Sequence, residues 1–170
     1  MQSEVIESLG DNGVGLRVEF TWCKDRFCHG ISRIDGSGRV RPLLESLEGI
    51  AADDWPTSPP LQSLTVHRLP SGQPAALLVG MAGRSHWSAS VEAATGQPRL
   101  LFDIACRHSG HAKAIGSCYQ IKGDVAELSI VAEDAAVSCT NETAKIEPNM
   151  AGANVTTSRW RYSISLSAHA

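Results

Sequence analysis

The feature that most constrains this chain is an alternation of apolar and polar side chains with a period of two residues. Near the N-terminus, Leu16, Val18, Phe20 and Trp22 occupy every second position, and polar residues fill the positions between them. The pattern returns at 160–166, where aromatic and aliphatic residues alternate with arginine and serine. Successive side chains of a β-strand point to opposite faces, so both runs predict half-buried strands.

Short turn-forming segments separate these runs along most of the chain. Examples are Asp-Gly-Ser-Gly at 35–38, Pro-Ser-Gly-Gln at 70–73 and Thr-Gly-Gln at 95–97. Strands at such regular spacing are typical of antiparallel sandwiches and barrels. The sequence therefore predicts an all-β fold: an antiparallel meander of about nine or ten strands that forms a barrel or a bent sandwich.

One segment departs from the period of two. Within 42–52, Leu43, Leu44, Leu47 and Ile50 recur near helical spacing. Apolar residues at this spacing form one face of an amphipathic helix. We therefore expect one short helix near 42–52.

The length of 170 residues suits a single β domain over 1–170. Within it, we interpret residues 1–12 as a flexible N-terminus and 140–154 as a polar loop. The proline-rich segment 55–60 favours extended backbone and is expected to connect strands inside the domain.

Charge and hydropathy argue against several partners. The net charge is −3, and the basic residues are scattered rather than gathered on one face, so we expect no nucleic acid and no anionic membrane as partner. No apolar run is long enough to span a bilayer. The first residues show neither a basic region nor an apolar one like those of a secretory signal, which favours a cytoplasmic location.

The stretch VGMAGRSHWSASVEA at 79–93 holds the candidate ligand-binding residues, Arg84 and His86. Gly80 and Gly83 favour a bend or bulge here over a hairpin tip, because a tight hairpin prefers Asn-Gly or Asp-Gly. Such a bend could aim Arg84 at a carboxylate or phosphate and bring His86 beside it. In the alternative interpretation, which the alternation favours, His86 faces solvent while Trp87 packs in the core.

The tryptophans raise the question of sugar binding, because exposed indole rings can stack on sugars. Trp22, Trp87 and Trp160 all fall on the apolar phase of their strands. This phase favours core packing for the three rings.

Cysteines and histidines form two groups along the chain. Zinc binds four such ligands in a tetrahedron, but these spacings match no established finger or ribbon. An odd total of five cysteines favours free thiols in a reducing compartment, with surface histidines, and a disulfide across a hairpin is a further alternative. No cofactor is predicted, and the weak candidates for zinc are Cys23, Cys28, Cys106, His108, His111 and Cys118.

Three classes of function remain open. The first is a non-catalytic barrel that binds a small, partly apolar molecule beside Arg84 and His86. The second is a protein-interaction or structural domain, for which a homodimer is one form. The third is a metal-binding protein or enzyme that uses the cluster from Cys106 to Cys118. No phosphate-binding loop, dinucleotide fingerprint or nucleophile elbow occurs, so the sequence leans away from an enzyme and assigns no catalytic residue.

Overall fold

The chain folds into antiparallel β-strands joined mostly by short turns. The computed structural model describes residues 3–108, 115–149 and 156–167, and in these it has one helical element, a 3₁₀ turn at Val125–Glu127. The strands are β1 (Ser3–Leu9), β2 (Gly15–Cys23), β3 (Arg26–Ile34), β4 (Val40–Ser46), β5 (Leu61–Arg68), β6 (Pro74–Ala82), β7 (Ser85–Ala93), β8 (Arg99–Arg107), β9 (Ser117–Ile121), β10 (Leu128–Glu133), β11 (Ala135–Cys139), β12 (Thr143–Pro148) and β13 (Thr157–Leu166).

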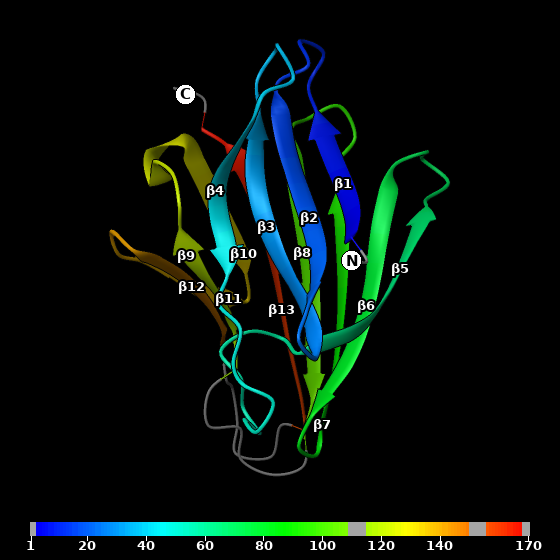
Figure 1. Cartoon of the computed structure of the whole chain (residues 1–170), viewed down its shortest axis with the longest axis vertical. Helices are drawn as coiled ribbons and strands as arrows, with labels where there is room; N and C mark the ends of the chain where they lie inside the picture. Colours follow the sequence, from blue (N-terminus) through cyan, green and yellow to red (C-terminus); the bar gives the residue numbers. More distant parts are fainter. Residues whose placement is uncertain (1–2, 109–114, 150–155, 168–170) are drawn as a thin grey trace.

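The strands form two sheets that pack face to face (Figure 1). One has seven strands in the order β1-β2-β3-β4-β9-β12-β11, and the other has six in the order β10-β13-β8-β7-β6-β5. In the described part of the chain neither sheet closes into a barrel. The predicted all-β antiparallel class is thus confirmed, in its sandwich form, but the described residues form 13 strands rather than the predicted nine or ten.

The core lies between the sheets and follows from the alternation in the sequence. Inward positions of β2 and β7 bury Val18, Phe20 and Trp87, each at most 2% exposed, and β13 buries Trp160 completely. Trp22 is the exception, because it is 38% exposed and packs edge-on against Phe27 at the end of the hairpin. The predicted core packing is therefore confirmed for two of the three tryptophans and wrong for Trp22.

The predicted helix near 42–52 is wrong, because its first half is strand β4 and the rest is a connection without helix. The register between β3 and β4 shifts near Ile31, where one residue of β4 is extra. Such a bulge interrupts the alternation, so the adjacent Leu43 and Leu44 are both buried. Two consecutive buried leucines resemble a helical face in the sequence, but Ile50 is 64% exposed.

Two further expectations need correction. The N-terminus predicted to be flexible over 1–12 contains β1, which pairs with β2 from Ser3 to Leu9. Ser8 anchors this strand by accepting a hydrogen bond from the Arg99 N–H at 3.0 Å. The polar loop predicted over 140–154 contains β12, which pairs with β9 and β11, and residues 150–154 lie outside the described part.

Residues 47–60, which we call the crossover, carry the chain from the seven-stranded sheet to the six-stranded sheet, at the lower end of the molecule in Figure 1. Ser58 fixes this connection to β9, because its hydroxyl donates to the Cys118 carbonyl and accepts from the Cys118 N–H, both at 3.1 Å. The segment thus has the connecting role predicted for 55–60. No helix among the described residues is long and apolar enough to cross a membrane.

Candidate functional site

A stripe of exposed apolar side chains runs along the outer face of the six-stranded sheet. It consists of Leu77, Val79 and Met81 on β6, which are 48%, 54% and 48% exposed. Alternation explains the stripe, since Ala76 and Leu78 fill the inward positions between them and are buried. On a half-solvated antiparallel sheet the outward positions are normally polar. We call these three residues the β6 stripe.

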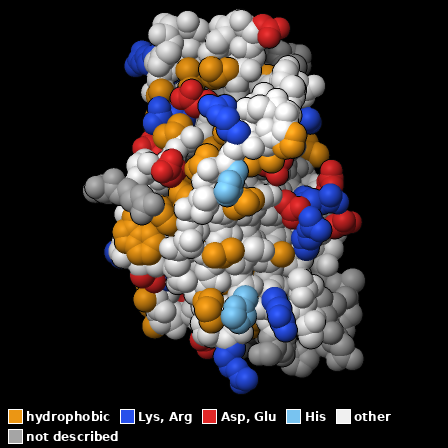
Figure 2. Space-filling view, turned by 90° about the vertical axis from the view of Figure 1, so that its right-hand side faces the viewer, with side chains coloured by type: hydrophobic (Ala, Val, Ile, Leu, Met, Phe, Trp, Pro, Cys, Tyr) orange, Lys and Arg blue, Asp and Glu red, His pale blue; other side chains and the backbone are white. Residues whose placement is uncertain are grey.

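Small side chains lie on both sides of the β6 stripe. Ser63 on β5 and Ser88 on β7 are the cross-strand partners of Val79, and Thr65 and Ser90 flank Leu77 in the same way. Figure 2 looks at the β5–β6 side of the molecule, where hydrophobic side chains lie among small ones and many charged groups gather near the margins. The outer face is therefore apolar along β6 and carries small side chains at the neighbouring positions of β5 and β7.

A hollow of about 690 Å³ opens on this face, with Val79 and Met81 in its apolar lining. His86 on β7 and Arg107 on β8 are cross-strand partners and line its polar side. The residues that line it in the described part of the chain include no carboxylate. The hollow can therefore accept an apolar group together with an anionic one.

The two predicted ligand-binding residues lie in different places. His86 lines the hollow, whereas Arg84 is exposed in the turn between β6 and β7 and lies outside the lining. Arg107 supplies the guanidinium instead. It lies 23 positions from Arg84 in the sequence, and only the pairing of β7 with β8 brings it beside His86.

Gly80 and Gly83, the two glycines of the stretch 79–93, are explained by turn geometry and close packing. The preference for a bend was wrong, because Ala82 pairs with Ser85 and Gly83 begins a two-residue hairpin turn with φ of +53°. Gly80 lies in β6 against the crossover, where a Cβ atom would lie 1.8 Å from the Pro60 carbonyl oxygen. Both glycines are therefore explained by backbone geometry: Gly83 forms the turn, and Gly80 allows the close approach of Pro60.

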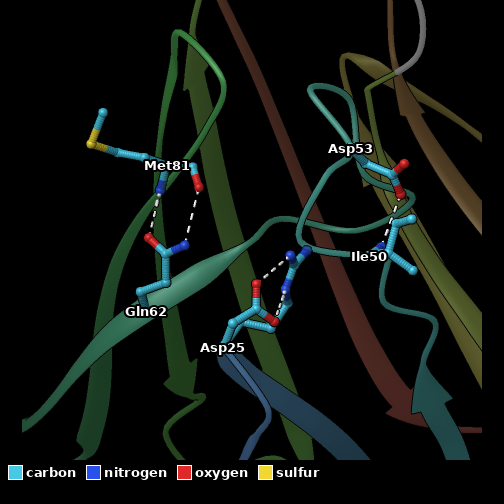
Figure 3. A network of polar contacts seen from close by, with 6 residues as sticks. Asp25, Ile50, Asp53, Gln62 and Met81 are labelled. Carbon is cyan, nitrogen blue, oxygen red and sulfur yellow. Dashed lines mark hydrogen bonds and ion pairs between the residues drawn. The ribbon is translucent and has the colours of Figure 1, made fainter.

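Beside Gly80, the side chain of Gln62 replaces a missing backbone partner (Figure 3). Its amide oxygen accepts from the Met81 N–H at 3.0 Å, and its amide nitrogen donates to the Met81 carbonyl at 3.1 Å. The register of β5 on β6 shifts between Leu61 and Ser63, so the backbone of β5 does not supply these bonds. Gln62 thus holds the end of the β6 stripe in sheet geometry.

The predicted metal ligands that lie in the described part of the chain do not form a metal site. Among the described residues, no three His, Cys, Asp or Glu side chains are grouped so as to hold a metal ion. Cys106 is buried in the core, where burial raises its thiol pKa to about 12. The backbone N–H of Cys118 donates a hydrogen bond to the hydroxyl of Ser58, and the ring of His108 packs on Trp55. His111 lies outside the described residues.

Cys23 and Cys28 lie on the outer face of the seven-stranded sheet and border a separate hollow of about 480 Å³. Burial, together with a hydrogen bond to the Cys23 thiol, raises the pKa of Cys28 to about 12. Metal ligands and thiol nucleophiles need the thiolate form. The raised pKa of Cys28 disfavours both roles for that thiol, and neither Cys23 nor Cys28 is in a disulfide.

The core contains a chain of polar side chains that links the two sheets. The Nε2 atom of His29 lies 3.0 Å from the hydroxyl of Tyr119, which lies 2.6 Å from the hydroxyl of Tyr162. The imidazole packs against Phe20 and Phe102, and this desolvation lowers the pKa of His29 to about 4. Burial likewise raises the pKa of Tyr162 to about 12, so these hydrogen-bonded side chains stay uncharged at neutral pH.

A buried arginine anchors the crossover. Arg26 is 3% exposed and forms two hydrogen bonds to the Asp25 carboxylate, of 2.8 and 3.1 Å (Figure 3). Glu48 and Asp53, both from the crossover, also interact electrostatically with its guanidinium. Desolvation raises the pKa of Glu48 to about 7, although its hydrogen bond from Ser46 and the charge of Arg26 oppose the shift.

Comparison with protein-family models, with curated proteins and with solved structures finds no match for this chain. Its function is therefore inferred from the surfaces described above. Of the surfaces described above, the outer face of the six-stranded sheet departs furthest from an ordinary solvated sheet.

Proposed function

We propose that this protein is a non-catalytic interaction domain that binds another folded surface through the outer face of its six-stranded sheet. The observation that carries the proposal is the β6 stripe, where three consecutive outward positions hold large apolar side chains, each about half exposed. Contiguous exposed apolar surface with a polar margin marks interaction sites in soluble proteins.

The surroundings of the β6 stripe support a protein partner. Serine and threonine side chains flank the stripe, so a broad opposing surface can approach Leu77 and Val79 without obstruction. An apolar centre surrounded by polar groups is also the usual anatomy of a protein interface.

Photo-crosslinking tests the proposal. A photoreactive amino acid placed at Val79 should give discrete protein adducts in the cells that make the protein, and Leu77→Asp should abolish them. The matched control is the same amino acid at Val137, which is 37% exposed on β11 of the other sheet. Equal adducts from both positions, or none from Val79, would contradict the proposal.

A small amphipathic anion is the second candidate, and the hollow beside His86 and Arg107 favours it. A medium-chain carboxylate such as decanoate would place its chain over Val79 and Met81 and its head at the guanidinium. We expect Arg107→Gln to weaken decanoate binding about 10- to 100-fold in calorimetry, since a charge-assisted hydrogen bond contributes roughly 1.5–3 kcal/mol.

Two controls accompany the decanoate titration. Decanol, which lacks the charge, should bind the wild-type protein no better than decanoate binds the Arg107→Gln variant. Arg84→Gln, outside the lining, should leave decanoate binding unchanged. A loss on Arg84→Gln alone would favour the anchor predicted from the sequence over the one found in the hollow.

A further inference from the structure

We propose that the surface bound by the β6 stripe is the same face of a second copy of this chain. This inference rests on the proposed function and names its partner. The two copies would pack face to face about a two-fold axis that lies between them, at right angles to the strands. The axis would pass midway between Leu77 and Val79.

Cross-strand pairing orders the face into rows, and the rows make it complementary to itself. A two-fold axis in this position places each row of one copy over a different row of the other. Leu77 then lies over Val79 of the second copy, so the apolar centre meets itself. The four rows, read across β6, β7 and β8, are Met81-His86-Arg107, Val79-Ser88-Ala105, Leu77-Ser90-Asp103 and Ala75-Glu92-Leu101.

Charge complementarity follows from the same arrangement. The outermost rows meet, so the row with His86 and Arg107 lies over the row with Glu92 of the second copy. Glu92 faces His86 along β7, and Arg107 lies one strand away, roughly 4.8 Å to the side. The two-fold axis repeats this contact, which gives two such clusters at opposite margins of the interface.

On β13 the same axis brings Arg159 over Arg161 of the second copy, but both arginines are already paired with carboxylates of their own chain. Arg159 forms an ion pair with Asp103, and Arg161 forms one with Glu133 at 3.0 Å. Within the described part of the chain, His86, Arg107 and Glu92 are outside every ion pair. They are therefore available to a partner.

The size of the face suits a stable dimer. Six strands spaced about 4.8 Å apart span roughly 25 Å, and seven or eight paired residues extend about 25 Å along the strands. A footprint of this size covers about 600 Å² on each copy, or about 1,200 Å² together, which is the lower end of the range for specific interfaces. Stacked sheets of this kind lie ~10 Å apart and cross at about 30°.

Sedimentation velocity of the full chain from about 1 to 300 μM tests the inference by a charge swap. We expect a dimer whose dissociation constant rises at least about 10-fold on Arg107→Glu and on Glu92→Arg, because each brings like charges together. The double variant restores the opposite-charge contact and should return to within about threefold of wild type. Val137→Asp is the matched control on the other sheet and should leave the dimer unchanged.

The outcomes separate this inference from the function on which it rests. The inference of a second copy is overturned if the wild-type chain stays monomeric over the whole concentration range. It is also overturned if the dissociation constant of the double variant rises by the combined effect of the two single variants. Val79 crosslinks to a protein of another mass would then keep the interaction function. A dimer that survives Leu77→Asp with circular dichroism unchanged would also overturn this inference, because the association would use another surface, and the Val79 crosslinks would again decide the interaction function.

Discussion

At the scale of single residues, two buried titratable groups give opposite pH dependences. Desolvation raises the pKa of Glu48 to about 7 and lowers that of His29 to about 4. The folded state thus prefers both side chains uncharged. Glu48 stabilises the fold most below its unfolded pKa, and His29 stabilises it most above its own.

For Glu48, the folded pKa lies above the unfolded value of about 4.5, so stability is lost as the pH rises from about 4.5 to 7. The loss is on the order of 3 kcal/mol, at about 1.4 kcal/mol per pKa unit. We expect Glu48→Gln to be more stable than wild type above pH 7 in urea unfolding. A variant less stable than wild type at pH 8 would contradict the assigned desolvation.

For His29, the folded pKa lies below the unfolded value of about 6.5, so stability is lost as the pH falls from about 6.5 to 4. The magnitude is again on the order of 3 kcal/mol. Between pH 6.5 and 4.5 the two residues offset each other in the wild-type protein. As the pH falls from 6.5 to 4.5, we expect the free energy of unfolding of Glu48→Gln to decrease, because His29 alone titrates. Over the same range we expect that of His29→Gln to increase, because Glu48 alone titrates. Parallel curves for both variants would refute this pairing.

At the scale of elements, the alternation located many of the strands, including β2, β7 and β13. It failed where the backbone departs from regular pairing. The bulge at β4 buries Leu43 and Leu44 together, and β1 has one large buried apolar side chain, Ile6. From the local sequence alone, the leucine pair of β4 resembles a helical face and β1 resembles a flexible terminus. Pairing with a neighbouring strand determines the structure of both segments.

The candidate site likewise contains residues that the sequence could predict and residues that it could not. His86 could be found because it lies on the outward phase of a recognisable strand. Arg107 could not, because its position beside His86 depends on the register of β7 with β8. The β6 stripe was hidden in a continuous apolar run, which indicates a strand but not which of its faces meets solvent.

Gly80 gives a direct test at this scale. A Cβ atom there would lie 1.8 Å from the Pro60 carbonyl oxygen, so Gly80→Ala must displace the crossover or the end of β6. We expect a loss of about 1–3 kcal/mol or more, as for other overpacked sites, measured by denaturant unfolding. Gly30→Ala is the matched control, since its nearest atom is 3.7 Å away and it should change stability little. Equal stabilities for the two variants would contradict the close approach.

At the scale of the whole molecule, the core between the sheets is packed and the candidate site lies on an outer face. The space between them is filled by aromatic rings and the chain from His29 through Tyr119 to Tyr162, which links β3 and β9 to β13. The hollow with the apolar lining described here lies on an outer face. Binding is therefore expected on the surface of the six-stranded sheet, where β6 carries its exposed side chains.

The most direct test of this account is the solvent exposure of methyl groups, measured by NMR with a soluble paramagnetic agent at increasing protein concentration. We expect the methyl groups of Leu77, Val79 and Met81 to become protected as the concentration rises, while those of Val137 stay exposed. If the three β6 methyl groups remain as accessible as that of Val137 at every concentration, the proposed pairing of this face with a second copy is wrong.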